Sequence, residues 1–369
     1  MPNHVSLEIL INKANQRGSL TEEDKNLIKR VFDSSKKAHQ GQKRKSGEEY
    51  FKHSYYTALQ LAEWGLDATT IAAGLLHDVA EDTSYTLDDI KSNFGEEIVF
   101  LVNGVTKLGR LKYRGAERQV ENLRKMFLAI SEDLRVVLIK LADRLHNMKT
   151  LNAVPPQKQK RIALETDEIY APLAYRLGMQ NLAGELEDLS FPYLYPQEYR
   201  WLLENVKEKY DERLKYLEKV KLVVDDLLKK INISPIAIDF RAKRYSSLYK
   251  KLKRYEMNLE QIYDLVAFRI IVKTIEDCYG ALGAIHQTWP PLPGKIKDYI
   301  ALPKPNGYRS LHTTVFCIGN KIVEFQIRTK EMHEESETGI AAHWAYHEKK
   351  ERNVEDKPTF ANKKELEWV

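Results

Sequence analysis

Apolar residues in the first half of the chain recur at helical spacing. From residue 68 they are Ala68, Ile71, Ala72, Leu75, Leu76 and Val79. Residues 136–145 and 165–177 repeat the spacing of three and four that marks one buried helix face. No alternating pattern typical of strands precedes about residue 235. The first part of the chain is therefore predicted to be all-α.

One long helix is predicted over Tyr199–Ile231, where Lys and Glu separate the apolar positions. A helix that is polar on most of its circumference often bridges two domains. Ser234-Pro235 ends this helix, because proline cannot continue it. We therefore expect a linking helical region between two domains.

Strand patterns begin after Pro235. Alternation in 236–240, the apolar run 265–272, and the segments 313–318 and 321–329 around Gly319-Asn320 predict strands and a hairpin. Helices are predicted at 247–255 and 276–287. The second part is therefore an α+β domain with a mixed sheet. The expected segments are 1–195 (all-α), 196–232 (linking helix), 233–348 (α+β) and 349–369 (charged tail).

Composition and charge exclude several classes of protein. Apolar residues make up 43% and charged residues 30% of 369 residues, which excludes wholesale disorder. The net charge of +5 is too small for a dedicated nucleic-acid binder. Cys278 and Cys317 form neither a zinc motif nor a disulfide framework. Without a signal peptide or membrane span, we expect a soluble, cytoplasmic protein that binds neither membranes nor DNA.

A first set of chemical residues surrounds the segment 77–82, His-Asp-Val-Ala-Glu-Asp. On a continuous helix, His77 and Glu81 are neighbours one turn apart. An isolated His-Asp pair is usually a solvated polar pair. Here His53 precedes it and Asp143 follows it, each beside an apolar helix pattern. This donor set suits a divalent cation such as Mn²⁺, Fe²⁺ or Zn²⁺ with positions left open for water and phosphate.

A second set lies in the α+β part, which has no P-loop and no dinucleotide-binding glycine motif. The basic run from Arg241 to Arg254 fits polyphosphate, nucleic acid or a solvated helix face. The strand 322–328 alternates apolar residues with Glu324, Gln326 and Arg328, and Asp264 begins a neighbouring strand. Two carboxylates near a polyphosphate suggest Mg²⁺ and a base for a hydroxyl nucleophile. Tyr308 either stacks on a base or packs on the sheet.

These motifs, in this order, resemble the RelA/SpoT homologues, the enzymes of the stringent response. The matching segments are 44–48 (RKSGE), 77–83 (HDVAEDT), 141–148 (LADRLHNM), 185–189 (ELEDL), 262–265 (IYDL), 306–313 (NGYRSLHT) and 324–329 (EFQIRT). The resemblance covers about residues 34–347. It implies a bifunctional enzyme that makes and degrades the alarmone (p)ppGpp, with an HD-type hydrolase domain and a nucleotidyltransferase-like synthetase (pyrophosphokinase) domain.

For the hydrolase, the resemblance implies that His53, His77, Asp78 and Asp143 bind Mn²⁺. Glu81 and Asp82 would orient and activate the water that attacks the 3′-pyrophosphate. The guanosine nucleotide would be held by Arg44, Lys45, Asn147 and Thr150.

For the synthetase, the resemblance implies that Glu324 assists the 3′-hydroxyl of GDP or GTP as it attacks the β-phosphate of ATP. Asp264 and Glu324 would bind Mg²⁺, and Tyr308 would stack on guanine. The remaining substrate contacts would come from Arg241, Lys243, Ser247, Lys251, Lys297, Lys304, Asn306, His312 and Gln326.

Three departures from the family pattern affect the expected activity. The loop before Asp298 reads Lys-Ile-Lys-Asp, whose charge is of the bifunctional type. Ala242 replaces the usual proline, which favours an alternative in which the synthetase is weak or regulatory. An RNA-binding module with vestigial sites is a third hypothesis. No TGS, zinc-finger or ACT-like segment follows, so ribosome contact is expected only through a regulatory half missing from this chain.

Overall fold

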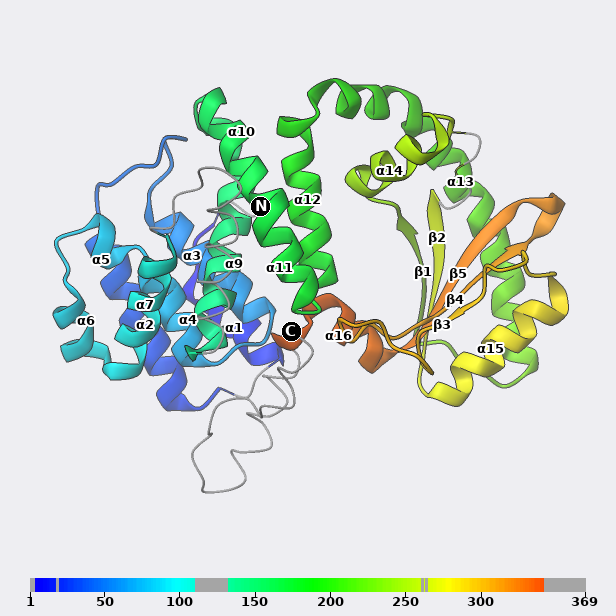
Figure 1. Ribbon diagram of the computed structural model, residues 1–369. Helices are drawn as coiled ribbons and strands as arrows, with labels where there is room; N and C mark the ends of the chain where they lie inside the picture. The colour runs from blue at the N-terminus through cyan, green and yellow to red at the C-terminus, as the bar shows by residue number, and fades with distance from the viewer. Residues whose placement is uncertain (1–3, 18–19, 110–131, 260–261, 263–264, 342–369) are drawn as a thin grey trace. The chain divides into compact units, whose positions relative to one another are not determined.

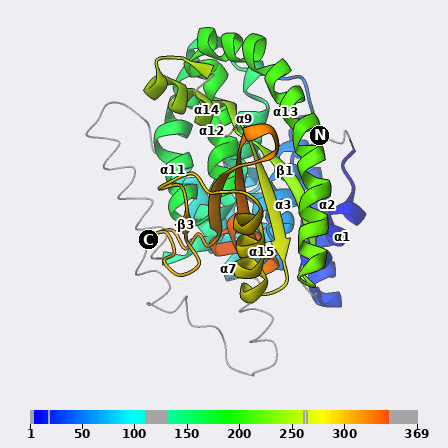
Figure 2. The same ribbon diagram turned by 90° about the vertical axis from the view of Figure 1, so that its right-hand side faces the viewer.

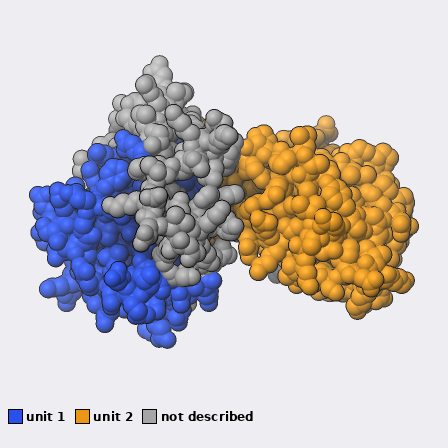
Figure 3. Space-filling view, turned by 90° about the horizontal axis from the view of Figure 1, so that it is seen from below, with its two compact units in different colours: residues 1–174, 340–367 blue, residues 175–339, 368–369 orange. Residues whose placement is uncertain are grey.

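The computed structural model describes residues 4–17, 20–109, 132–259, 262 and 265–341 (Figure 1). Contacts divide the chain into two compact units, residues 1–174 with 340–367 and residues 175–339 with 368–369 (Figure 3). The first boundary therefore lies before the expected one at residue 195. The reason is that helix α12 (Gln180–Leu194) packs on α14 (Tyr245–Leu252) and α16 (Lys330–Thr338) of the second unit.

Helices build the described part of the first unit, as predicted. They are α1 (Leu7–Arg17), α2 (Glu22–Ala38), α3 (Phe51–Glu63), α4 (Ala68–Leu76), α5 (Val79–Asp82), α6 (Leu87–Phe94), α7 (Glu96–Gly109), α9 (Leu134–Lys149) and α10 (Pro156–Glu165). A 3₁₀ turn, η1 (Leu151–Ala153), precedes α10, and a π-helical turn, η2 (Thr166–Tyr170), leads from α10 into α11 (Ala171–Arg176). The helical pattern read over 165–177 thus contains a π-turn.

Helix α4 lies at the centre of this unit and contacts α2, α3, α7 and α9. Its side chains Ile71, Ala72 and Leu75 are fully buried. Gly74 allows α3 to approach closely, because a Cβ at that position would lie 2.5 Å from Leu61 Cδ1. Close packing of α3 on α4 brings the metal-ligand candidates of the two helices together.

Side-chain caps fix where the site-bearing helices begin. The Asp67 carboxylate accepts a hydrogen bond from the Thr70 backbone N–H at 2.7 Å, at the start of α4. The Asp133 carboxylate accepts one from the Arg135 N–H at 2.8 Å, at the start of α9. Such caps stabilise a helix end by about 1 kcal/mol.

The second unit contains a five-stranded mixed sheet in the order β1-β2-β5-β4-β3. The strands are β1 (Ala237–Ala242), β2 (Val266–Val272), β3 (Lys297–Asp298), β4 (Leu311–Phe316) and β5 (Ile322–Thr329). Strands β2 and β5 are parallel, and the other neighbours are antiparallel. The α+β fold, its mixed sheet and the β4–β5 hairpin are confirmed.

One face of this sheet is the apolar core. Val323, Phe325 and Ile327 of β5 are fully buried in a cluster with residues of α13 (Pro196–Lys230) and α15 (Ile275–Thr288). Figure 2 shows where these two helices run. Leu217, Val220, Val224 and Leu228 of α13 are fully buried there. The long helix at 196–230 is therefore a core element of the second unit and not the separate linking region that its polar circumference suggested.

Two short 3₁₀ turns complete the described elements of the second unit, η3 (Lys253–Tyr255) and η5 (Ile318–Asn320). Asp264 and the charged tail at 349–369 lie outside the described residues. Across the described part of the chain, no helix combines the length and the apolar character that crossing a lipid bilayer requires.

Candidate functional sites

Three buried side chains from separate helices meet in the first unit. His53 of α3, His77 after α4 and Asp143 of α9 each offer a ligand atom, and these atoms lie within 4.8 Å of one another. The carboxylate of Asp78 completes the set, with its oxygens 3.4 Å from His53 Nε2 and 3.3 Å from His77 Nε2. The structure thus brings together the four predicted metal ligands.

The hydrogen bonds of the two histidines fix their tautomers. Arg44 can only donate, and its Nη1 lies 3.3 Å from His146 Nδ1, so that nitrogen accepts. His53 Nδ1, 2.8 Å from the same atom, is therefore also a donor. His77 Nδ1 donates to the Gly74 carbonyl at 2.8 Å. Both histidines consequently direct the Nε2 lone pair toward the centre of the cluster, as metal-ligating imidazoles do.

This arrangement fits a divalent cation. The two Nε2 atoms face each other at 3.2 Å, and in these tautomers neither carries a proton to share. His53 and His77 would hold such a cation through these nitrogens, which would relieve the repulsion between them, and imidazole and carboxylate donors suit a transition metal. Burial lowers the pKa of His77, but Asp78 and Asp143 outweigh burial and raise that pKa to about 9.

The carboxylates of the cluster are held ionised. Burial would raise the pKa of Asp78 and of Asp143, yet His77 acting on Asp78 and Lys140 acting on Asp143 keep both well below the ordinary value. The Lys140 ammonium lies 2.6 Å from Asp143 Oδ2, and Asn147 Nδ2 donates to Asp143 Oδ1 at 2.5 Å. Burial, with His53 and Arg44 nearby, lowers the pKa of His146 to about 2, so His146 is neutral.

The predicted continuous helix over 77–82 is wrong. Helix α4 ends at Leu76, and α5 begins at Val79, so His77 and Asp78 lie in the turn between them. The turn points both side chains at the cluster, which one continuous helix face could not do, because neighbouring residues diverge by about 100°. Asp82 contacts the Tyr50 hydroxyl, whereas Glu81 is solvent-exposed beside it.

A cavity of about 580 Å³ adjoins the cluster in the first unit. It contains Asp143 and the four predicted nucleotide-binding residues Arg44, Lys45, Asn147 and Thr150. Arg44 is fixed in place, because its Nη2 donates to Asn147 Oδ1 at 2.5 Å and its Nη1 to Thr150 Oγ1 at 3.3 Å. Other cations of the wall that the sequence did not single out are Lys43, Lys140, Arg144 and Arg161. An anionic ligand is the expected occupant.

In the second unit, three predicted residues form a chain of hydrogen bonds on the polar side of the sheet. His312 Nδ1 lies 3.2 Å from Glu324 Oε1, and Tyr308 Oη lies 2.8 Å from His312 Nε2. A carboxylate only accepts, so Nδ1 carries the proton and Nε2 accepts from the tyrosine hydroxyl. Gln326 Nε2 donates to Glu324 Oε1 at 3.2 Å. Glu324 is thereby fixed by two neighbours.

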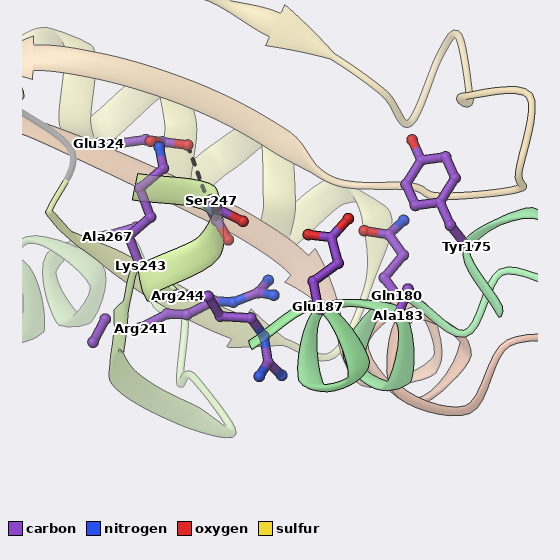
Figure 4. Close-up of a pocket in the computed structure, with 13 residues that line it drawn as sticks. Tyr175, Gln180, Ala183, Glu187, Arg241, Lys243, Arg244, Ser247, Ala267 and Glu324 are labelled. Atoms are coloured by element: carbon purple, nitrogen blue, oxygen red, sulfur yellow. Dashed lines mark hydrogen bonds between the residues drawn. The ribbon is translucent and has the colours of Figure 1, made fainter. Parts of the chain in front are cut away.

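A cavity of about 360 Å³ lies beside this chain of hydrogen bonds (Figure 4). Five predicted residues line it, and they are Arg241, Lys243, Ser247, Glu324 and Gln326. The side chain of Lys243 extends toward Glu324 in Figure 4. Arg244 of the predicted basic run and Glu187 of the 185–189 motif also line the cavity. Three cations beside a fixed carboxylate suit a polyphosphate and a hydroxyl that loses a proton.

Four other predicted synthetase residues, Asn306, Lys304, Lys297 and Lys251, do not line this cavity. Asn306 is buried, donates to the Tyr175 carbonyl at 3.2 Å and accepts from the Tyr308 N–H. The Lys304 ammonium lies 4.9 Å from the centre of the Tyr308 ring. Lys297 is exposed on β3, opposite His312. Lys251 lies on α14 with its ammonium 6.0 Å from the ring of Tyr255.

The stacking role predicted for Tyr308 is not evident in this conformation. Its side chain is only 6% exposed, and Tyr299 and His312 contact the ring edge-on. For a guanine base to stack there, the Lys304 side chain would have to move off the ring. Tyr308 here packs on the sheet and holds His312.

Comparisons with known proteins match two separate parts of the chain to two families. Residues 32–180 match the HD domain family, and residues 240–351 match the region found in RelA/SpoT proteins. The guanosine-3′,5′-bis(diphosphate) 3′-pyrophosphohydrolase of Aquifex aeolicus (strain VF5) is 50% identical over 341 residues, which are 92% of this chain and 48% of that protein. The bifunctional (p)ppGpp synthase/hydrolase SpoT of Escherichia coli (strain K12) is 45% identical over 330 residues, 89% of this chain and 47% of that protein.

Among solved structures, the small alarmone synthetase 2 from Bacillus subtilis is 29% identical, with 43% of this chain and 85% of that chain covered and a TM-score of 0.29. The chain spans about half the length of the two curated relatives described above. The chain therefore combines an HD domain with a region of the kind found in RelA/SpoT proteins.

Proposed function

We propose that this chain is a bifunctional alarmone enzyme. One activity transfers pyrophosphate from ATP to the 3′-hydroxyl of GDP or GTP, and the other hydrolyses (p)ppGpp to GDP or GTP plus pyrophosphate. The carrying observation is that each compact unit contains its own site, a buried histidine–carboxylate cluster in one and a carboxylate beside three cations in the other. The name of the Escherichia coli relative states both activities for that protein.

The first unit is the hydrolase. His53, His77, Asp78 and Asp143 would hold the cation, for which we propose Mn²⁺. A divalent cation supplies an acidified water and neutralises phosphate charge. Asp82, with Glu81, receives the proton of the attacking water. The cations of the 580 Å³ cavity bind the pyrophosphate groups, and the fixed Arg44 lies where it can contact the nucleotide.

The second unit is the synthetase. Glu324 accepts the proton of the 3′-hydroxyl as the oxygen attacks the β-phosphorus of ATP and AMP leaves. Arg241, Lys243 and Arg244 neutralise the triphosphate, which matters because the transition state is loose and little covalent help is available. His312 keeps the Glu324 carboxylate in place. Asp264 and Glu324 would hold Mg²⁺, which shields the phosphate charge.

A weaker synthetase remains the second candidate because of Ala242. Strand β1 stays paired through this residue, opposite Val266, and the Lys243 N–H donates to the Leu265 carbonyl at 2.8 Å. The extended backbone that carries Arg241 and Lys243 is therefore formed without a proline. This regularity favours the bifunctional enzyme. Free nucleotides as substrates agree with a cytoplasmic enzyme.

Product analysis tests the proposal. The chain is incubated with ATP and GDP in Mg²⁺, and separately with ppGpp in Mn²⁺, and nucleotides are separated by anion-exchange chromatography. We expect ppGpp and AMP in the first reaction and GDP with pyrophosphate in the second. Hydrolysis without detectable synthesis would replace the proposal by the hydrolase alternative. RNA binding with turnover in neither direction would support the vestigial module.

A further inference from the structure

Tyr50 contacts several functional side chains of the first unit, although it was not among the predicted site residues. It lies at the start of α3, three residues before His53, and lines the 580 Å³ cavity. Its hydroxyl contacts two carboxylates, Asp78 Oδ2 at 3.0 Å and Asp82 Oδ2. One of these is a candidate metal ligand, and the other is the proposed acceptor of the water proton. No other described side chain forms hydrogen bonds with both Asp78 and Asp82.

The ring of Tyr50 makes a second group of contacts with functional side chains. It stacks on His39, with ring centres 4.8 Å apart and an angle of 18°, and it meets His53 edge-on at 6.2 Å. The Arg44 guanidinium lies 5.9 Å from the ring centre, within the range of a cation–π contact. The ring therefore helps to position Arg44 at the cavity, and the hydroxyl helps to position the carboxylates of Asp78 and Asp82.

We propose that Tyr50 is a positioning residue of the hydrolase site, an inference that rests on the proposed hydrolysis of ppGpp. Its hydroxyl holds the Asp82 carboxylate beside Asp78, so that a water at the cluster meets its proton acceptor in a reactive orientation. Asp82 lies at the last position of the four-residue helix α5 and is solvent-exposed. Among the described residues, its other hydrogen bond to a distant segment is made by the backbone carbonyl, which accepts from Gln42 Nε2 at 2.6 Å.

The two parts of the side chain predict two separable kinetic effects. Tyr50→Phe keeps the ring and removes the hydroxyl. Asp82 therefore loses its hydrogen bond to residue 50, while Arg44 keeps its cation–π contact with the ring. Outer partners of metal-site residues typically contribute 10- to 100-fold to activity or metal affinity. We expect kcat for ppGpp hydrolysis to fall about 10- to 100-fold, with KM within about threefold of wild type. Tyr50→Leu also removes the ring and should raise KM in addition.

Tyr55→Phe is the matched control. Tyr55 lies on the same helix, is 1% exposed, and donates its hydroxyl to the Ser6 carbonyl at 3.0 Å, away from the cluster. This variant loses one buried tyrosine hydroxyl of the same helix, so it reports the general cost of that change. We expect its kcat to match wild type.

The experiment combines steady-state ppGpp hydrolysis with Mn²⁺ titration of the nucleotide-free protein by electron paramagnetic resonance. The inference predicts that Tyr50→Phe binds Mn²⁺ within about threefold of wild type and that saturating Mn²⁺ does not restore kcat. An unchanged kcat in Tyr50→Phe, or a kcat fully restored by more Mn²⁺, overturns it. An equal kcat loss in Tyr55→Phe also overturns it. If the wild-type chain itself does not hydrolyse ppGpp, the proposed function fails first, and the inference falls with it.

Discussion

Replacing Lys140 by methionine should destabilise the first unit strongly when no metal is bound, and less when a divalent cation is present. The Lys140 ammonium lies 2.6 Å from Asp143 Oδ2, and the two side chains are 14% and 5% exposed. Removing one partner of such a buried pair leaves an uncompensated charge and typically costs about 3–5 kcal/mol. Asp143 keeps the Asn147 amide, so we expect a loss near the lower limit, about 3 kcal/mol in EDTA.

A divalent cation changes this result in a definite direction. In Lys140→Met the cation takes over the role of countercharge to Asp143, and the ammonium no longer repels it. A saturating ligand stabilises wild type and variant alike, so only tighter binding to the variant narrows the difference between them. If the variant binds Mn²⁺ about tenfold more tightly, the difference shrinks by about 1.4 kcal/mol, which is roughly half of the loss in EDTA.

In the assay, unfolding in urea is monitored by hydrogen–deuterium exchange in peptides of α3 and α9, once in EDTA and once in Mn²⁺. These helices carry His53 and Asp143, so they report the first unit without contributions from the second. Lys140→Arg, which keeps the positive charge, serves as the control and should unfold close to wild type. The reasoning is refuted if the variant loses less than about 1 kcal/mol in EDTA, or if Mn²⁺ leaves the difference unchanged.

Two further predictions concern the second unit. Burial, with Arg328 and Arg269 nearby, lowers the pKa of His333 to about 4. The unfolded chain therefore binds a proton that the folded one does not, and the free energy of unfolding should fall as pH drops from about 6.5 toward 4. Urea unfolding at several pH values should show a shallower fall in His333→Gln, and an identical slope would contradict this assignment. His312→Asn should lower kcat for ppGpp synthesis roughly 10- to 100-fold and leave hydrolysis intact, because Glu324 loses the donor that orients it; equal losses in both assays would contradict this.

The sequence predicted the parts of the fold that depend on local pattern. Helical spacing located the helices of the first unit, and the alternation in 322–328 correctly assigned Val323, Phe325 and Ile327 to the core. The role of α13 was misjudged, because a narrow apolar stripe on a charged helix cannot reveal which surface covers it.

The metal-ligand candidates were predictable because motif order places each one beside an apolar helix pattern. The supporting side chains were not predictable. Tyr50 and His146 make their contacts through tertiary packing, with 28 positions between Tyr50 and Asp78 and 93 between His53 and His146. Lys140 lies one helical turn from Asp143, but its sequence context is that of any lysine on a helix. The turn between α4 and α5 was missed for a related reason: no proline or glycine marks it.

The central claim is that two independent sites in one chain catalyse opposite reactions. The direct test is reciprocal substitution, in which Asp78→Ala and Glu324→Ala are each assayed for ppGpp synthesis in Mg²⁺ and ppGpp hydrolysis in Mn²⁺. We expect Asp78→Ala to lose hydrolysis and keep synthesis, and Glu324→Ala to show the reverse. Equal loss of both activities in both variants would contradict the assignment of one reaction to each unit.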